Sequence, residues 1–314
     1  MAHQTRSAGR RATTAVAWTT GKRAVRAGAL WGASFGLMVW NEALSYHTNF
    51  PTVASRQAFA QSLGSNTGMA AIIGPGRRLD TIEGFVAWRM FGLMVIVGAV
   101  WGLLTATRLL RGEEDAGRWE LLLAGRTSRR HAAARGLVGL TSGLAALWAV
   151  TAALTVAAGT RSNVGFPVSA SLFYATAGTA TAAIFLAVGA LTSQLSPTRR
   201  QANALAAAAL GVCFGMRRVA DSVTGLAWLR WASPLGWVEN LRPLTGSQPL
   251  ALVPIILLVA AAAVATVTVA GRGDPGAGVL TRPESGRSTR GSSAARSSWS
   301  PGRPGSSSPC MSPA

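Results

Sequence analysis

The apolar residues of this chain are collected into blocks of about twenty, and they do not recur at the spacing of a surface helix or strand. A helix of about 20 apolar residues crosses a hydrocarbon core of roughly 30 Å, because each residue rises about 1.5 Å. Hydrophobic residues make up 49% of the 314 positions and charged residues only 13%, against about 25% charged in a soluble domain. The blocks predict an all-α integral membrane protein with about six transmembrane helices. The expected spans are 25–46, 85–107, 136–158, 169–195, 201–221 and 249–270.

Composition divides the chain into three parts. Residues 1–24 are polar and basic, which predicts a cytoplasmic or interfacial amino-terminal segment. Residues 25–270 hold the six expected spans. Residues 271–314 are rich in Ser, Gly, Pro and Arg, and such a composition buries too little apolar area to order itself. A low-complexity, disordered tail is the prediction for that part.

The formal net charge of +19 raises the question of nucleic-acid binding. The basic residues stand in loops and tails instead of on one helix face, so we expect no nucleic-acid partner. Of the 30 Lys and Arg, 21 fall in residues 1–26, 108–135, 196–201 and 271–314. Six spans place these four segments on one side, and the excess of positive charge predicts that this side is cytoplasmic. The chain is therefore expected in the plasma membrane, multi-pass, in contact with lipid and with both termini cytoplasmic.

A charged island, RGEEDAGRWELLLAGRTSRR at residues 111–130, separates the second and third expected spans. Its acidic residues stand at the start of the island, where they would lie at the positive, amino-terminal end of a helix dipole. Trp119, Leu122 and Leu123 form an apolar ridge, since the two leucines stand three and four residues after the tryptophan. A solvated loop is the plain interpretation, but an apolar patch rimmed by charge more often marks a surface that another protein covers.

EEDAGRWELLLAGRTSRR resembles the cytoplasmic segment that follows the second span of type-2 ABC exporter permeases. The branch most similar to it is that of the bacterial polyketide antibiotic or multidrug exporter permeases. Further pieces agree in order along residues 25–280, namely RRLDTIEGFVAWR, SPTRRQAN, RRVADS and WASPLGWVENLRPLTG. The resemblance implies that 25–270 is a permease domain that moves hydrophobic or amphiphilic small molecules out of the cell, as in antibiotic or drug efflux.

In such exporters the island is a coupling helix that docks on a separate ATPase subunit. Carried over to residues 111–125, the resemblance implies these docking positions: Glu113, Glu114, Arg118, Trp119, Glu120, Leu122 and Leu123. The chain itself has no phosphate-binding loop, because Gly21-Lys22 lacks the earlier glycine and the Ser or Thr that such a loop requires. ATP hydrolysis is therefore expected of the ATPase subunit, and this chain is not expected to be an enzyme or to hold a cofactor. Spacings typical of a metal site, HExxH or CxxC, are absent from the sequence.

Four charged residues lie close to the ends of expected spans. A charge at the bilayer centre costs about 2.5–3.5 kcal/mol on insertion scales, and Asp221 is spaced to pair with Arg217 and Arg218 and lessen that cost. One interpretation is an ion cluster at the outer end of the fifth span. The other is a polar lining of the translocation path, for which the candidates are Glu42, Arg217, Arg218 and Asp221.

Two alternatives to an ATP-driven exporter stay open. An ion- or proton-coupled secondary transporter would need acids near the middle of its spans, whereas Glu42 and Asp221 fall at span ends. A truncated, non-functional half of a twelve-span permease is the second, because related permeases often continue into another six-span half and the match fades near Leu280. A working six-span permease is expected to pair as a homodimer or with a second permease half.

Small residues recur within the expected spans, for example at Gly28, Gly32 and Gly36 and again at Gly139 and Gly143. Helices in lipid cannot associate through the hydrophobic effect, so small residues that let backbones approach closely are enriched where helices meet. These positions predict helix packing inside the bundle, with a substrate groove as the alternative.

Overall fold

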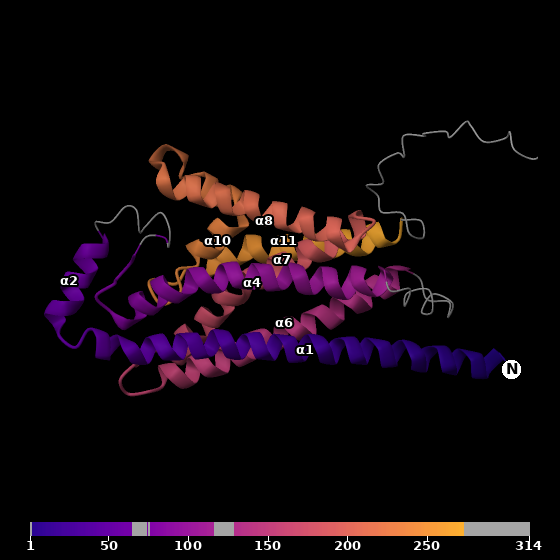
Figure 1. Ribbon diagram of the computed structural model, residues 1–314, viewed down its shortest axis with the longest axis horizontal. Coiled ribbons are helices and arrows are strands. Elements are labelled where there is room, and N and C mark those ends of the chain that lie inside the picture. The colour runs from indigo at the N-terminus through magenta and orange to yellow at the C-terminus, as the bar shows by residue number, and fades with distance from the viewer. Residues whose placement is uncertain (1, 65–73, 75, 116–128, 273–314) are drawn as a thin grey trace, which may run out of the picture. The chain divides into compact units, whose positions relative to one another are not determined.

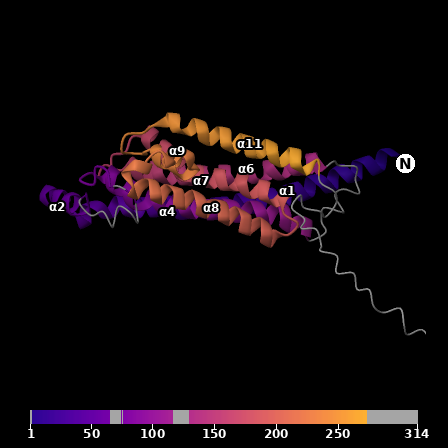
Figure 2. The same ribbon diagram turned by 90° about the horizontal axis from the view of Figure 1, so that it is seen from above.

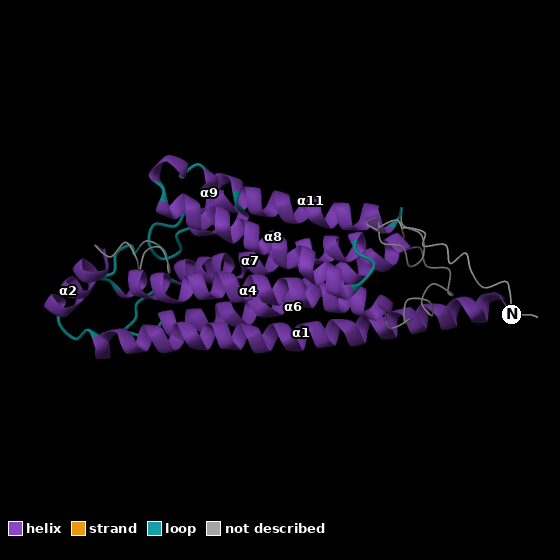
Figure 3. Ribbon diagram, turned by 45° about the horizontal axis from the view of Figure 1, so that its top comes forward, coloured by secondary structure: helices purple, strands orange, loops and turns teal. Residues whose placement is uncertain are grey.

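The structure is a computed structural model that describes residues 2–64, 74, 76–115 and 129–272. Every regular element within those ranges is helical (Figures 1 and 3). The predicted tail lies outside the described residues from position 273 onward. In chain order the elements are α1 (Ala2–Asn49), α2 (Val53–Gly64), α4 (Ile82–Asp115), α6 (Arg129–Gly159), α7 (Val168–Leu195), α8 (Arg199–Ser222), the 3₁₀ turn Thr224–Leu226, α9 (Leu229–Ala232), α10 (Pro234–Asn240), the 3₁₀ turn Pro249–Ala251 and α11 (Leu252–Ala270).

The long helices α1, α4, α6, α7, α8 and α11 run alternately in opposite directions (Figures 1 and 2). One end of the bundle, called here the island end, holds the last residues of α4, the first of α6, and the α7–α8 turn. The other end, called here the cleft end, holds α2, α9 and α10. Side-chain contacts fix these ends: Arg111 of α4 bonds to the Pro197 carbonyl at the island end, and His47 Nε2 lies 2.8 Å from the Asn163 carbonyl at the cleft end.

Four described helices are long and apolar enough to cross a membrane: Ile82–Arg111, Arg130–Gly159, Val168–Leu195 and Pro249–Ala270. They coincide with the second, third, fourth and sixth expected spans. The structure therefore confirms an all-helical chain with four helices of membrane-crossing length and composition.

The first and fifth expected spans, 25–46 and 201–221, are also continuous helix, within α1 and α8. Neither is among the four apolar helices, because each has polar residues close to its apolar run. Asn41 and Glu42 interrupt α1, while Gln201 and Arg217 flank the alanine-rich stretch of α8. That these two helices cross the membrane stays a prediction.

Large apolar side chains lie on the outer surface of the bundle as well as in its interior, and the interior also buries hydroxyl side chains. Leu30, Val138 and Ile256 are each more than half exposed. Buried threonines such as Thr107, Thr179 and Thr266 satisfy their hydroxyls by donating to a carbonyl four residues earlier. In water such a surface would be unfavourable, so this distribution fits helices surrounded by lipid.

Glycines set close helix contacts at predicted positions such as Gly28 and Gly143, whereas a Cβ at Gly139 would meet no described residue within 4 Å. α1 packs along α6, and a Cβ added at Gly28 would lie 2.0 Å from the carbonyl oxygen of Gly143. α4 packs along α7, where a Cβ at Gly102 would lie 2.4 Å from the Ala182 carbonyl oxygen. Because no side chain fits at either position, the two helices of each pair touch backbone to backbone. Gly211 of α8, in contrast, faces open space.

α2 was not predicted, since its sequence is polar and lacks a long apolar block. Aromatic packing holds it against the bundle: the Phe59 ring lies 4.5 Å from that of Phe50 and 5.8 Å from that of Phe85, centroid to centroid. Tyr46, at the end of the first expected span, completes this group with its ring 5.2 Å from Phe85. The helix thus depends on contacts distant in sequence, which local patterns do not reveal.

Candidate functional site

The charged island begins as a direct continuation of a membrane helix. α4 does not stop at the end of the second expected span but runs on to Asp115, so Glu113 and Glu114 occupy its last turn. The remaining docking positions lie outside the described residues: Arg118, Trp119, Glu120, Leu122 and Leu123. α6 begins at Arg129, and the island therefore joins two long helices at the island end.

Arg111 anchors the helix that leads into the island. Its side chain is buried, with the residue 6% exposed, and its Nη2 donates to the carbonyl oxygen of Pro197 in the α7–α8 turn. A guanidinium that bonds to a free carbonyl at a chain turn is a charge-assisted contact, stronger than one between neutral groups. Movement of the end of α4 is thereby linked to the start of α8.

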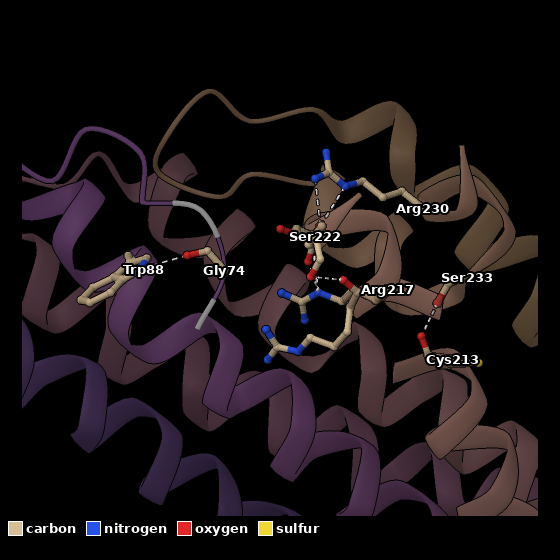
Figure 4. A network of polar contacts seen from close by, with 10 residues as sticks. Gly74, Trp88, Cys213, Arg217, Ser222, Arg230 and Ser233 are labelled. Atoms are coloured by element: carbon tan, nitrogen blue, oxygen red, sulfur yellow. Dashed lines mark hydrogen bonds and ion pairs between the residues drawn. The ribbon is translucent and has the colours of Figure 1, made fainter. Parts of the chain in front are cut away.

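At the cleft end, a polar cluster joins α8 to the segment that follows it (Figure 4). Arg217 Nε donates to Oε2 of Glu239 at 2.8 Å and lies 3.7 Å from Oδ2 of Asp221. Asp221 Oδ1 in turn accepts from Arg230 Nε at 2.9 Å. These four residues, Arg217, Asp221, Arg230 and Glu239, are called the polar cluster below.

Three of the four side chains in the polar cluster are largely buried, and that of Arg230 is 28% exposed. The side chains of Arg217 and Asp221 are 6% and 3% exposed, and that of Glu239 is 13% exposed. Charges removed from water are tolerated when they are paired and hydrogen-bonded, and removing one member leaves the others uncompensated. Because α8 and α10 supply opposite charges, the cluster ties these two elements together.

Local sequence explains how α10 reaches α8. Ser233 Oγ donates to the Cys213 carbonyl of α8 at 2.9 Å, and Pro234 occupies the first position of α10, where proline is well accommodated. A Cβ at Gly236 would lie 2.2 Å from the Arg230 carbonyl oxygen, so a glycine is needed for this turn to close. The bend carries Glu239 back to Arg217.

The structure brings two of the four predicted path residues into direct contact, Arg217 and Asp221. Arg218 instead lies with its guanidinium 4.7 Å from the centroid of the Phe214 ring. Glu42 is apart from the cluster, with Oε2 at 3.4 Å from Arg89 Nε. Glu239 and Arg230 were not predicted as members of this site, although both stand in the segment WLRWASPLGWVENLRPLTG.

A cleft of about 60 Å³ opens beside the polar cluster. Arg77 and Arg242 line it together with Arg217 and Glu239, and Trp88 forms part of its apolar wall. Trp88 Nε1 donates to the Gly74 carbonyl at 3.1 Å (Figure 4). Burial, and then the neighbouring Arg242, lower the pKa of the Arg77 guanidinium from its ordinary value, while Glu239 acts in the opposite direction.

Metal-binding clusters are absent from the part of the chain that the structure describes. Groups of three or more His, Cys, Asp or Glu side chains that could hold a metal ion do not occur there. The arginines at the cleft end are suited to binding a negatively charged group.

Comparison with known proteins decides the family. Residues 13–271 match the model of the multidrug efflux system permease Rv1217c, C-terminal domain. The chain belongs to this permease family. The match covers α1 from residue 13 onward and the other five long helices in full. It confirms the predicted resemblance at the level of an ABC-type efflux permease, and the polyketide antibiotic branch stays a prediction.

One similar protein is the multidrug efflux system permease protein Rv1217c of Mycobacterium tuberculosis (strain ATCC 25618 / H37Rv). It is 32% identical over 249 residues, which are 77% of this chain and 42% of the relative. The chain thus spans less than half the length of that relative. Membership in the permease family and the apolar helices together place the chain in a membrane.

Proposed function

We propose that this chain is the membrane-spanning permease subunit of an ABC exporter and moves hydrophobic or amphiphilic small molecules out of the cell. The observation that carries the proposal is the family match over residues 13–271. The relative from Mycobacterium tuberculosis is a multidrug efflux system permease protein, which supports drug-like cargo.

A separate ATPase subunit supplies the energy and docks on residues 111–125. The arrangement of the helices supports this position, because α4 and α6 both reach the island end and the island connects them. Trp119, Leu122 and Leu123 provide the apolar contact, and Glu113, Glu114, Arg118 and Glu120 the charged rim. This side of the membrane is the cytoplasm, on the basis of the Lys and Arg distribution.

Force on the island would reach the whole bundle through two tightly packed helix pairs. α6 is in backbone contact with α1 at Gly28, and α4 with α7 at Gly102. Closely packed interfaces transmit displacement and do not absorb it. A push between α4 and α6 therefore separates the α4–α7 pair from the α1–α6 pair, which opens and closes a path between them.

A proton-coupled transporter is less well supported. None of the four apolar helices has an Asp or Glu in its middle turns: in α4 the acids stand at Glu83 and at Glu113–Asp115, and α6, α7 and α11 have none. Glu42 and Asp221 each face an arginine. Groups that carry protons across a membrane are expected along the translocation path instead.

Copurification tests the docking part of the proposal. The chain carrying Trp119→Glu should lose its ATPase subunit when purified from membranes, since a carboxylate is forced into an apolar contact. Val53→Glu is the matched control, because Val53 is exposed at the first residue of α2 at the cleft end. Retention of the ATPase by the Trp119 variant, or its loss from both variants, would count against docking at the island.

A second permease half completes the transporter, either as another copy of this chain or as a different polypeptide. The face around Gly211 on α8, where an added Cβ would meet no described residue within 4 Å, supports contact between halves. Crosslinking of a cysteine placed at Gly211 in membranes should yield a dimer if the second half is another copy. A homodimer interface elsewhere would leave that crosslink absent while a dimer persists in native gels.

A further inference from the structure

The cleft beside the polar cluster has a charged lining that neither efflux nor ATPase docking explains. It is lined by Arg77, Arg217 and Arg242, by the single acid Glu239, and by the rings of Trp88 and Phe91. The lining comes from the chain before α4, from α4 itself, from α8, and from α10 with the region that follows it. Four separate parts of the sequence therefore converge on one small space.

Positive charge is in excess around this space. Glu239 forms an ion pair with Arg217 at 2.8 Å, and Asp221 forms one with Arg230. Counting Arg77 and Arg242, four arginines stand against two carboxylates, which leaves a net charge of +2. Like charges held close together in a partly buried site repel one another unless an anion joins them.

Arg242 has donor capacity that the protein does not use. Its Nε is buried and has no hydrogen-bond partner among the described residues. A buried donor without a partner destabilises the protein. Binding an anion would satisfy this donor and offset the charge excess in one step.

The backbone holds Arg242 in an unusual conformation. Its φ is +45°, and Leu244 follows with φ of +65°, a region that residues other than glycine seldom adopt. The hydrogen bond from Gln248 N to the Leu241 carbonyl, at 2.9 Å, closes the loop around these residues. Strained backbone persists where the surrounding structure fixes it, so the guanidinium is held at the cleft.

The volume limits what can enter. The cleft measures about 60 Å³, whereas sites for drug-sized molecules span about 300–1,000 Å³. A whole amphiphile does not fit, but a carboxylate or phosphate group does. Arginine presents planar pairs of N–H donors that match both groups.

The surroundings indicate an interface between lipid and water. Trp228 and Trp231, which follow α8 at this end, are 62% and 63% exposed, as is typical of tryptophans at the edge of a membrane. Trp88 and Phe91 offer apolar surface on α4 beside the arginines. An anionic group in the cleft would thus come from a molecule whose apolar part lies along α4.

We propose that this cleft binds the anionic group, a carboxylate or a phosphate, of an amphiphilic molecule through Arg77, Arg217 and Arg242. The site is formed by this chain alone and does not depend on the ATPase subunit. The amphiphile is either a cargo molecule or a membrane lipid, and both offer the same chemistry to the arginines.

Direct binding tests the proposal. The purified full chain in phosphatidylcholine nanodiscs is titrated with radiolabelled dodecyl phosphate and laurate, with dodecanol as the uncharged comparison. We expect saturable binding of both anions and none of dodecanol. Arg242→Gln should weaken binding of both anions by about tenfold or more, and Arg242→Lys should restore part of it because the charge returns without the planar donor pair.

Arg161→Gln is the matched control, since Arg161 is an exposed arginine at the same end, stacked on Trp40 outside the cleft. It should bind the anions as the unaltered chain does. Size-exclusion chromatography before each titration establishes that both variants are folded. Equal affinity of the Arg242→Gln and unaltered chains, or equal binding of dodecanol, would overturn the proposal.

Two further arms identify the source of the anion. Phosphatidic acid included in the nanodiscs should compete with dodecyl phosphate if the ligand is a lipid, and should leave it unaffected if the ligand is a soluble amphiphile. Inorganic phosphate that binds as tightly as dodecyl phosphate would contradict the role of the apolar part. Because no ATPase is present, failure here would concern the cleft and would leave the exporter assignment untouched.

Discussion

Arg217 Nε of α8 lies 2.8 Å from Oε2 of Glu239 in α10. The two residues are 22 positions apart and both are largely buried, so the ion pair fixes the position of the segment that returns from α8 toward α11. This contact is the centre of the polar cluster and forms one wall of the cleft.

Glu239→Gln should destabilise the chain, because Arg217 keeps its buried charge and loses its closest carboxylate. We expect a loss of about 2 to 3 kcal/mol in the free energy of unfolding, measured as a lower melting temperature in detergent. Glu42→Gln is the comparison: its partner Arg89 is 51% exposed and 3.4 Å away, so the loss should stay below about 1 kcal/mol. Equal losses in the free energy of unfolding would show that burial does not increase the contribution of the Arg217–Glu239 pair to stability.

Gly28→Ala should separate α1 from α6. The added methyl group would lie 2.0 Å from the Gly143 carbonyl oxygen, and a backbone shift of this kind costs about 1–3 kcal/mol. The same substitution at Gly211 meets nothing within 4 Å and should be neutral or slightly stabilising, since alanine favours helix. Thermal unfolding of the two variants in one detergent provides the measurement, and a Gly28 variant as stable as the Gly211 variant would refute this packing.

Arg111→Gln should weaken the island end by breaking the bond to the Pro197 carbonyl. A hydrogen bond from a charged group is worth about 1.5–3 kcal/mol, so a loss near 2 kcal/mol is expected. Arg108→Gln, one turn earlier and exposed, should change stability little. Hydrogen exchange of the α7–α8 turn should rise in the Arg111 variant alone; unchanged exchange would mean that Pro197 is held by other contacts.

Reporter fusions test which side each end faces. A fusion at Arg126 should be cytoplasmic and one at Ser65 external, as the excess of Lys and Arg predicts. Fusions at Thr198 and Gln248 ask whether α8 crosses the membrane, and they should report opposite sides. An external Arg126 fusion would reverse the orientation, and Thr198 and Gln248 on one side would reduce the number of spans.

The sequence predicted the long helices well because block length is set by the thickness of the bilayer and not by tertiary contacts. It also predicted close helix contacts at Gly28 and Gly143. It did not predict that α4 would extend to Asp115, since charged residues such as Glu113 ended the apolar block while the helix itself continued.

The polar cluster was predictable only in part. Arg217 and Asp221 are four residues apart on one helix, so their pairing follows from helix geometry. The contact of Arg217 with Glu239 depends on the turn at Ser233 and Gly236, which brings α10 back to α8. The cleft was also unpredictable, because Arg77 and Arg242 are 165 positions apart in the sequence and meet only through the packing of α4 against α8.

ATP-dependent uptake of a fluorescent amphiphile into inside-out membrane vesicles tests the central claim most directly. Vesicles that contain the chain, its ATPase subunit and any second permease half should accumulate the amphiphile only when ATP is hydrolysed. Trp119→Glu should abolish uptake, and Val53→Glu should leave it intact. Uptake driven by an imposed proton gradient without ATP, or undiminished uptake by the Trp119 variant, would contradict an exporter driven through the island.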